Sequence, residues 1–264
     1  FGDRLESAQG PTYMNCTGYT EDDHAYQHQQ FKCEGIDSIT DYLEQRHIDL
    51  HKSMIEFGTY DYSLAQRGID IGLDASTNVP GIYAAGICCG NVRGNITSAS
   101  VWGDIAGESV AAYVKTVDDY DVSGHPLIGQ RADFYNQLMN RQNGAQWLEA
   151  NSSLQVIMND YIGLKVRSED MMRAGIKYLG DLKSYAQQEI GCEDAHQLMR
   201  TMELFDLIDL AEAVAISSRN RKESRGMHRR IDYTFTNPLL NNKFQTIRKT
   251  ADGEVVLEWR DKVK

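Results

Sequence analysis

The spacing of apolar residues changes character near the middle of the chain. In the second half they recur at alternating three- and four-residue steps, the spacing of one helical face. We predict helices over residues 130–143, 152–162, 168–191 and 193–222. Inward positions are expected to include Phe134, Leu138 and Met139 in the first helix, and Leu204, Ile208, Ala211 and Ala215 in the fourth. Apolar stripes of this kind pack against one another, so this half of the chain predicts a helical bundle.

The first half alternates short apolar runs with turns. Runs at 54–57 and 69–73 indicate strands. Thr20 and Asp23 form a capping pair that predicts a helix start, and Gly35 ends that helix. A second helix from residue 38 to about 47 is expected to bury Ile39, Tyr42 and Leu43. Near the end of the chain, residues 244–250 and 254–259 flank Ala-Asp-Gly, which predicts a β-hairpin.

The stretch from 78 to 115 joins the two halves. Pro80-Gly81 marks a turn, 82–85 reads as a buried strand, and glycines follow at 86, 90 and 94. Asn95 or Thr97 caps the next helix, which carries Val101, Ile105 and Ala112 on one face. A strand, a glycine loop and a helix of small residues aim backbone N–H groups at an electron-rich ligand. An ordinary βα unit with a glycine turn explains the local pattern equally well.

Composition limits the classes of function. The chain has 264 residues with 41% hydrophobic residues, enough for a core, and no apolar run long enough to cross a bilayer. Its net charge of −11 argues against nucleic acid or an anionic membrane as a partner. Five cysteines without paired spacing indicate a reducing, cytoplasmic location.

Two small clusters have candidate chemistry. His24 and His28 have a spacing that suits a metal on a helix, but a solvated helix face is the favoured interpretation. Cys88 and Cys89 are interpreted first as two buried side chains beside the glycine loop, with a redox role at the edge of a bound cofactor as the alternative.

Two motifs resemble a known family. The run V-P-G-I-Y-A-A-G at 79–86, followed by G-N and V-W-G-D-I-A-G, resembles the second flavin-contacting segment of the fumarate reductase, succinate dehydrogenase, L-aspartate oxidase and adenylylsulfate reductase flavoproteins. The run E-S-R-G-M-H-R-R-I-D-Y at 223–233 resembles the tract that those proteins carry after a helical domain. The resemblance covers nearly the whole chain, but only the C-terminal part of a family protein.

The resemblance implies an FAD site. It assigns flavin contacts to Gly86, Ile87, Gly94, Asn95, Thr97 and Ser98. Thr97 and Ser98 would present backbone N–H groups to the pyrimidine oxygen of the flavin. Arg93 stands where the substrate-gripping arginine is expected, so it is the catalytic candidate; a loop arginine in solvent or paired with Asp104 is an equal alternative.

The sequence also departs from the family. Ile87 replaces the Glu or Asp that meets the ribityl chain, which weakens the flavin assignment without abolishing it. Tyr60, Asp61 and Tyr62 stand where a dicarboxylate-binding histidine is expected. Succinate or fumarate as substrate is therefore in doubt, and adenylylsulfate reductase-like chemistry stays open.

A further basic cluster lies in and before the second motif, made of Arg219, Arg221, Lys222, Arg225, Arg229 and Arg230. It is either a partner or substrate surface, or a helix end with arginines paired to Glu223 and Asp232. The resemblance favours the second interpretation, since the family's tract docks one domain on another.

These observations predict an α+β fold in four parts. Residues 1–58 would link the capping and FAD-binding domains, 59–117 end the FAD-binding domain, 118–222 form the bundle, and 223–264 hold the tract and hairpin. The chain begins at Phe1 and contains no G-x-G-x-x-G, the motif that holds the ADP half of FAD in the family. We therefore expect a fragment without the N-terminal FAD domain, colourless and inactive alone.

In the intact protein the resemblance implies hydride transfer between FAD and a small anionic substrate. An iron–sulfur electron-transfer subunit is a further expected partner, through which the protein would associate with a membrane. The alternative is a non-catalytic interaction module derived from such a flavoprotein.

Overall fold

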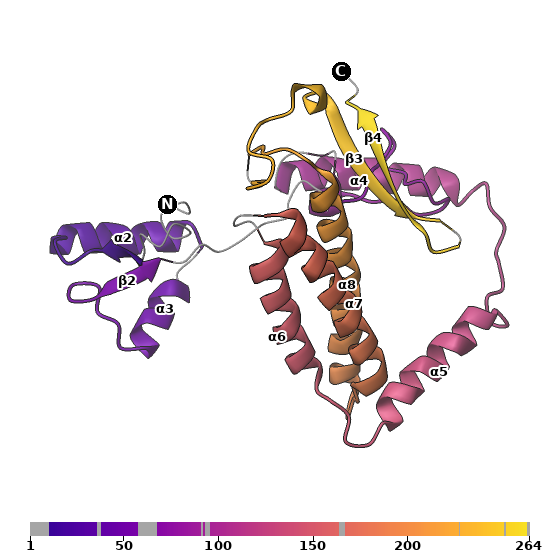
Figure 1. Cartoon of the computed structure of the whole chain (residues 1–264), viewed down its shortest axis with the longest axis horizontal. Coiled ribbons are helices and arrows are strands. Elements are labelled where there is room, and N and C mark those ends of the chain that lie inside the picture. Colours follow the sequence, from indigo (N-terminus) through magenta and orange to yellow (C-terminus); the bar gives the residue numbers. More distant parts are fainter. Residues whose placement is uncertain are drawn as a thin grey trace. The chain divides into compact units, whose positions relative to one another are not determined.

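The computed structural model describes residues 11–35, 38–57, 68–90, 92, 96–163, 167–226, 228–250 and 252–262. The chain divides into two compact units, Phe1–Asp61 and Tyr62–Lys264. Figure 1 labels the helices α2–α8 and the strands β2–β4 of the two units.

The first unit pairs a short sheet with two helices. β1 (Thr12–Asn15) and β2 (Met54–Phe57) are antiparallel, which confirms the strand predicted at 54–57, and α2 (Glu21–Cys33) and α3 (Ser38–Gln45) lie between them in sequence. The Thr20 hydroxyl accepts from the Asp23 N–H, and the Asp23 carboxylate accepts from the Thr20 N–H at 2.8 Å. This capping box confirms the predicted start of α2.

Two burial predictions in this unit are wrong. Ile39 and Tyr42 of α3 are 42% and 54% exposed. His24, expected on a solvated face, is buried because its ring stacks on His51 with centroids 3.6 Å apart.

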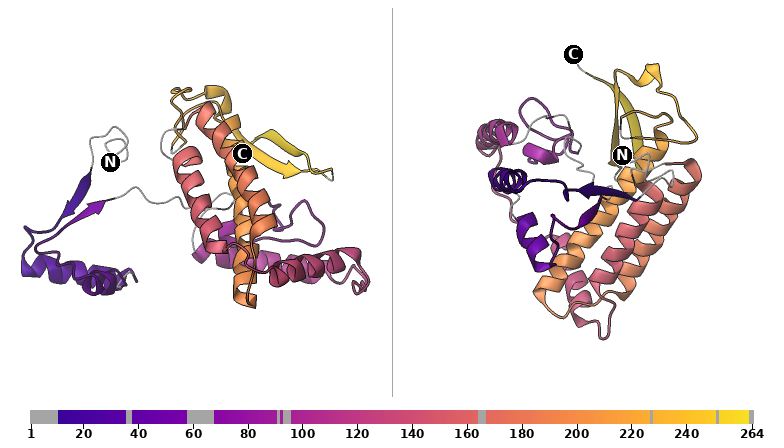
Figure 2. Two further views of the ribbon diagram at one scale, coloured as in Figure 1. Left: turned by 60° about the horizontal axis from the view of Figure 1, so that its bottom comes forward. Right: turned by 90° about the vertical axis from the view of Figure 1, so that its left-hand side faces the viewer.

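The second unit contains a bundle of three long segments. α6 (Trp147–Ile157) continues into a π-helical turn, η2 (Met158–Ile162), and is followed by α7 (Glu169–Glu189) and α8 (Ala195–Asn220). Figure 2 shows α6, α7 and α8 running side by side. α7 starts where predicted, since the Ser168 hydroxyl accepts from the Met171 N–H.

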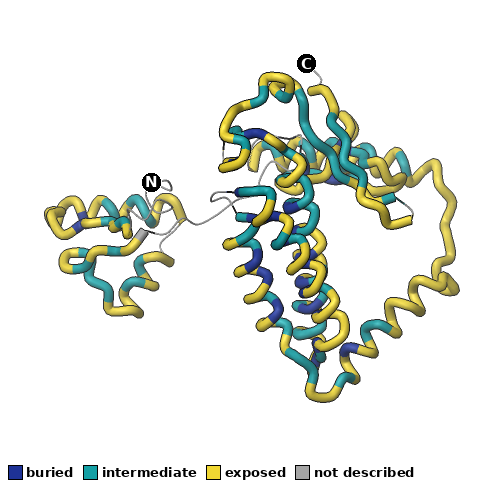
Figure 3. The backbone as a smooth tube through the Cα atoms, in the orientation of Figure 1, coloured by how far each residue is buried: buried dark blue, intermediate teal, exposed yellow. Residues whose placement is uncertain are grey.

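The bundle core follows the predicted stripes. All four expected positions of α8 are buried, and they pack with Leu138, Leu154, Leu179 and Leu182. Figure 3 shows buried positions recurring along the three helices. Met139 was wrongly predicted inward and is 37% exposed. Its helix, α5 (Pro126–Asn140), contacts the bundle through few residues, so only Leu138 is fully buried.

Glycine permits one close contact in the bundle. A Cβ on Gly175 of α7 would lie 2.8 Å from Ile162 and 2.9 Å from Tyr161, both in η2. The wider π-helical turn and the missing side chain therefore fit together.

The region before the bundle has less regular structure than predicted. The strands expected at 69–73 and 82–85 are absent from the described residues, and these two segments form only isolated bridges, between Ile69 and Cys89 and between Ser76 and Tyr83. A 3₁₀ turn, η1 (Gly86–Cys88), leads toward α4 (Ile96–Tyr113). A strand needs several consecutive bridges, and each of these segments forms only one.

A small second core holds this region on α4. It consists of Ile71, Ala75, Ala84, Cys89 and Val92, packed against Trp102, Ile105 and Ala106. Of the three residues assigned to one face of α4, Ile105 packs against this core, whereas Val101 and Ala112 are exposed. The helix turns Trp102 inward because its ring offers far more apolar area than Val101.

The C-terminal hairpin is confirmed. β3 (Lys243–Lys249) and β4 (Val255–Asp261) are antiparallel, with Lys243 opposite Asp261, and the short helix η3 (Pro238–Leu240) precedes them. Arg260 of β4 donates to the Asp70 carboxylate at 2.9 Å. The α+β class, with a helical region followed by a hairpin, is as predicted.

Among the described residues no helix combines the length and the apolar character needed to span a bilayer.

The core predicts a sharp difference between two leucines of α8. Leu204 is 1% exposed and Leu207 is 46% exposed. Leu204→Ala should lower the free energy of unfolding by about 3 kcal/mol, because it leaves a cavity, and Leu207→Ala by less than about 1 kcal/mol. Urea unfolding followed by circular dichroism measures both, and equal losses would contradict the assigned core.

Candidate functional site

The first candidate site is the loop and helix start around Gly86. Gly86 has a φ of +79°, which favours glycine, and a Cβ there would lie 3.5 Å from the Cβ of Ala99 in α4. The backbone of η1 therefore passes close to the first turns of α4. Glycine at position 86 and alanine at position 99 therefore permit a close approach of the loop backbone to the helix.

The exposed side of this junction is apolar. Ile87 and Ile96 are 70% and 83% exposed, and Thr97 is also exposed. The Ser98 hydroxyl oxygen is shielded from solvent and has no hydrogen-bond partner within the described residues. An orphaned hydroxyl in the first turn of a helix, where unpaired N–H groups also lie, leaves polar capacity for a ligand.

The predicted site residues are only partly described. Gly86 and Ile87 lie in η1, and Thr97 and Ser98 in the first turn of α4, two elements in direct contact. Arg93, Gly94 and Asn95 lie outside the described residues. The flavin and substrate assignments therefore stay predictions.

The vicinal cysteines differ from each other. Cys89 is buried, as expected, whereas Cys88 is exposed and its thiol donates to the Ala85 carbonyl at 3.2 Å. Burial, together with the neighbouring Cys88, raises the pKa of Cys89 to about 11. Cys89 is therefore a thiol at neutral pH and serves the small core.

The second candidate site is the arginine–carboxylate tract, which we define as residues 219–233 with Arg167 and Glu169. At its centre Glu223 is fully buried. Its carboxylate accepts from Arg221, from Arg225 Nε at 3.0 Å and from the Asn237 N–H at 2.8 Å. Burial alone would raise the pKa of Glu223, but these hydrogen bonds outweigh it and the pKa is lowered.

A second ion pair ties the tract to α7. Buried Arg230 donates to both oxygens of Asp232, at 2.7 and 2.6 Å, and Asp232 also accepts from the Glu169 N–H at 2.8 Å. The bond from Arg230 is the main reason that the pKa of Asp232 falls to about 2. A carboxylate held at the first turn of α7 also suits the helix dipole.

A buried histidine completes the tract. His228 Nδ1 lies 2.6 Å from Arg167 Nη1, and Nε2 lies 2.9 Å from the Arg221 carbonyl oxygen. A guanidinium only donates, so Nδ1 accepts and Nε2 carries the proton. Burial, reinforced by nearby Arg167, Arg221 and Arg230, lowers the pKa of His228 to about 4.

The interpretation of the basic cluster as structure is confirmed for the arginines that pair with Glu223 and Asp232. Sequence reasoning missed Arg167, which lies 61 residues from its partner His228. Only the motif resemblance placed the two segments in one protein, and it assigned no contact between them.

The metal interpretation finds no support. Among the described residues no three His, Cys, Asp or Glu side chains are grouped to hold an ion.

Comparison with known proteins finds relatives of this chain. Residues 151–262 match the family model described as the C-terminal part of fumarate reductase flavoproteins. The chain is 28% identical over 182 residues to the fumarate reductase flavoprotein subunit of Haemophilus influenzae, covering 63% of this chain and 30% of that protein. The chain therefore spans about a third of the length of such relatives.

Solved structures show the same fold. A quinol fumarate reductase of Escherichia coli superimposes with a TM-score of 0.76 at 22% identity, covering 95% of this chain and 44% of the other. Adenylylsulfate reductase of Archaeoglobus fulgidus gives a TM-score of 0.76 at 18% identity, covering 100% and 49%.

The fold and the tract thus resemble the C-terminal portion of flavoproteins. Residues 151–262 match the family model, and the chain is similar to the C-terminal portion of fumarate reductase, succinate dehydrogenase and L-aspartate oxidase flavoproteins.

The described residues fit one edge of a flavin. Gly86 keeps the loop backbone close to α4, and the Ser98 hydroxyl lacks a partner within the described part of the chain. Exposed Ile87 and Ile96 offer apolar surface for a flat ring. Ile87 also removes the carboxylate expected at the ribityl chain, so the fit is to the ring edge.

His228 predicts a loss of stability in mild acid. Its pKa is about 4 in the folded chain against 6.5 ordinarily, so below pH 6.5 the unfolded chain binds a proton that the folded chain does not. Folding stability should fall by about 3 kcal/mol between pH 6.5 and 4. Urea unfolding across this range measures it. His228→Asn removes the titrating group, and an unchanged slope in that variant would contradict the assignment.

A substitution of Glu223 that preserves its shape is expected to lower the free energy of unfolding strongly. Glu223→Gln keeps the shape but leaves Arg221 and Arg225 without their anion, so unfolding should need about 3 kcal/mol less. Glu203→Gln is the matched control, because its pair with Arg200 is exposed and should cost under about 1 kcal/mol. Equal effects in thermal unfolding would show that the tract does not depend on Glu223.

Proposed function

We propose that this chain is the C-terminal part of an FAD-dependent oxidoreductase in which Gly86, Ile87, Thr97 and Ser98 line the flavin ring. The close approach of Gly86 to Ala99, beside a Ser98 hydroxyl without a described partner, is the observation that supports it best. The match of residues 151–262 to the fumarate reductase flavoprotein model supports the redox class.

The role of these residues would be to hold the flavin ring and to polarise it. A bound flavin supplies the hydride transfer. The N–H groups of Thr97 and Ser98, at the positive end of α4, would stabilise negative charge on the reduced ring. Gly94 and Asn95 are proposed to complete this edge. Arg93 is proposed to grip a substrate carboxylate through two parallel hydrogen bonds.

The substrate is proposed only as a small anion. The relatives named as fumarate reductases favour a dicarboxylate, whereas Tyr60, Asp61 and Tyr62 replace the histidine expected to bind one. The adenylylsulfate reductase fold keeps a sulfur anion open as an alternative.

The proposal extends to parts of the intact protein outside this chain. An N-terminal FAD domain would lie upstream, and electrons would pass to an iron–sulfur subunit. Such a subunit would also provide a link to the membrane from the cytoplasmic side, since solved relatives include a quinol-fumarate reductase with menaquinol.

A non-catalytic interaction module is the second candidate. Loss of the acidic residue at Ile87 favours it, because a carboxylate that binds the ribityl chain has no use without flavin. The chain would then bind a partner through the exposed surface of its bundle.

Expression of the complete reading frame that contains these residues tests the proposal. We expect a yellow protein with one FAD per chain that oxidises a reduced viologen dye in the presence of a small anionic substrate. A colourless, inactive product would favour the interaction module. The 264-residue chain alone should be colourless.

One substitution pair tests the flavin edge. Gly86→Val places a branched side chain at a positive φ, 3.5 Å from Ala99, and should abolish FAD retention. Gly103→Ala in α4 is the control, since no described atom lies within 4 Å of its added Cβ. Absorbance of gel-filtered protein reports bound FAD, and full retention by Gly86→Val would remove this loop from the site.

A further inference from the structure

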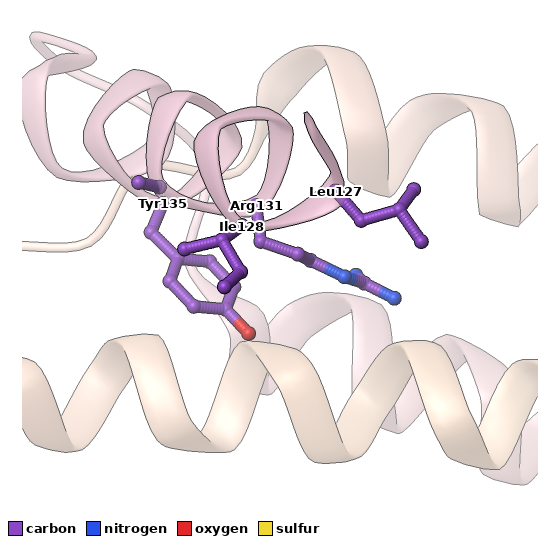
Figure 4. Close-up of a pocket in the computed structure, with 5 residues that line it drawn as sticks. Leu127, Ile128, Arg131 and Tyr135 are labelled. Atoms are coloured by element: carbon purple, nitrogen blue, oxygen red, sulfur yellow. The ribbon is translucent and has the colours of Figure 1, made fainter. Parts of the chain in front are cut away.

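An apolar hollow lies on the first turns of α5. It has a volume of about 410 Å³ and is lined by Leu127, Ile128, Arg131, Ala132 and Tyr135. Figure 4 shows the four labelled side chains projecting from one side of the helix. Leu127 and Ile128 are 61% and 49% exposed, so apolar area here remains open to solvent.

The hollow contains an unused charge. Within the described residues the Arg131 guanidinium forms no hydrogen bond or ion pair. A guanidinium beside leucine, isoleucine and tyrosine side chains suits a ligand that joins a carboxylate to an apolar or aromatic group. The chain has a net charge of −11, so a cation left in this apolar setting is a specific feature.

The chain itself contains a segment that combines carboxylates with apolar and aromatic side chains. The acidic connector, which we define as residues 117–122 (V-D-D-Y-D-V), joins α4 to α5. Val117, Tyr120 and Val122 are 45%, 75% and 54% exposed. Asp118 and Asp119 have no hydrogen bond or ion pair to any described residue. Figure 3 draws this connector as a continuous exposed tube.

The connector does not reach the hollow of its own chain. The His125 N–H donates to the Val122 carbonyl at 2.9 Å, and the Asp121 carboxylate accepts from the Ser123 N–H at 2.9 Å. These turns fix the end of the connector at the start of α5. Arg131 lies more than one helical turn further along α5 and contacts none of the connector's carboxylates. Both complementary surfaces are thus available to a second molecule.

We propose that the acidic connector of one copy docks in the α5 hollow of a second copy, and reciprocally. Tyr120 would fill the apolar hollow while Asp118 and Asp119 meet Arg131. The two identical contacts would be related by a two-fold axis, which is the symmetry of most homodimers. The net negative charge of each copy opposes association, so the contact depends on this local complementarity.

Charge reversal with mixing tests the proposal. Arg131→Glu makes the hollow acidic while the connector stays acidic; Asp118→Lys/Asp119→Lys makes the connector basic while the hollow stays basic. Each variant alone should therefore dimerise at least about tenfold more weakly than the original chain. An equimolar mixture should regain the dimer, because both exchanges again join opposite charges. Sedimentation velocity and native mass spectrometry resolve homodimers from the mixed species.

Two controls separate the local contact from a general effect of charge and from unfolding. Lys177→Glu makes the same change in net charge as Arg131→Glu at an exposed position of α7 that pairs with no described residue, and it should leave the dimer constant unchanged. Circular dichroism establishes that each variant is folded.

Three results would overturn the proposal. They are a monomer at every concentration of the original chain, a dimer unaffected by either reversal, and a mixture that gains no heterodimer. One further measurement interprets the last result. If the mixture gains no heterodimer but a single chain with all three substitutions regains the free energy of unfolding of the original chain, the contact lies within a single copy.

Discussion

The tract that follows α8 depends on the burial of one carboxylate. Glu223 has no exposed surface, and an unpaired carboxylate there would cost several kcal/mol. Arg221, Arg225 and the Asn237 N–H satisfy it. Because these partners come from both sides of a turn that begins at the end of α8, the charge can be buried only when that turn is closed. The tract is thus folded by an electrostatic requirement rather than by apolar packing.

The same requirement links the tract to the bundle. Arg230, Asp232 and Glu169 continue the network to the start of α7, and Arg167 reaches His228. Each guanidinium places its charge against a carboxylate, a carbonyl or a neutral imidazole. The histidine can take part only because it is uncharged, since a proton on Nδ1 would face the Arg167 guanidinium. The network therefore fixes the tautomer as well as the position of the ring.

Regular packing was predictable from sequence, and irregular geometry was not. The stripe of α8 follows from residue spacing alone, because a helix buries every third or fourth position. The missing strands at 69–73 and 82–85 were not predictable from their apolar residues, since a strand also requires a partner strand. The inward position of Trp102 depends on which of two adjacent faces meets the small core. His24 is buried by His51, a contact between distant residues that local spacing does not encode.

The candidate site was likewise only partly predictable from the sequence. The motif resemblance placed the flavin edge near Gly86 and Ser98, and the structure brings their two elements into contact. Neither the positive φ of Gly86 nor the orphaned hydroxyl of Ser98 can be read from residue types. No partner was predicted for Arg167, because an arginine before a helix gives no signal of a partner far along the chain.

The ion pair between Arg260 and Asp70 bears on the order of folding. It spans 190 residues, and closing a flexible loop of that length costs about 5 kcal/mol. Both side chains are nearly half exposed, and such a pair returns less than about 1 kcal/mol. The pair can therefore form only after the bundle between them has already shortened that loop. During synthesis on the ribosome, the segment that leads into η1 would gain this tether last.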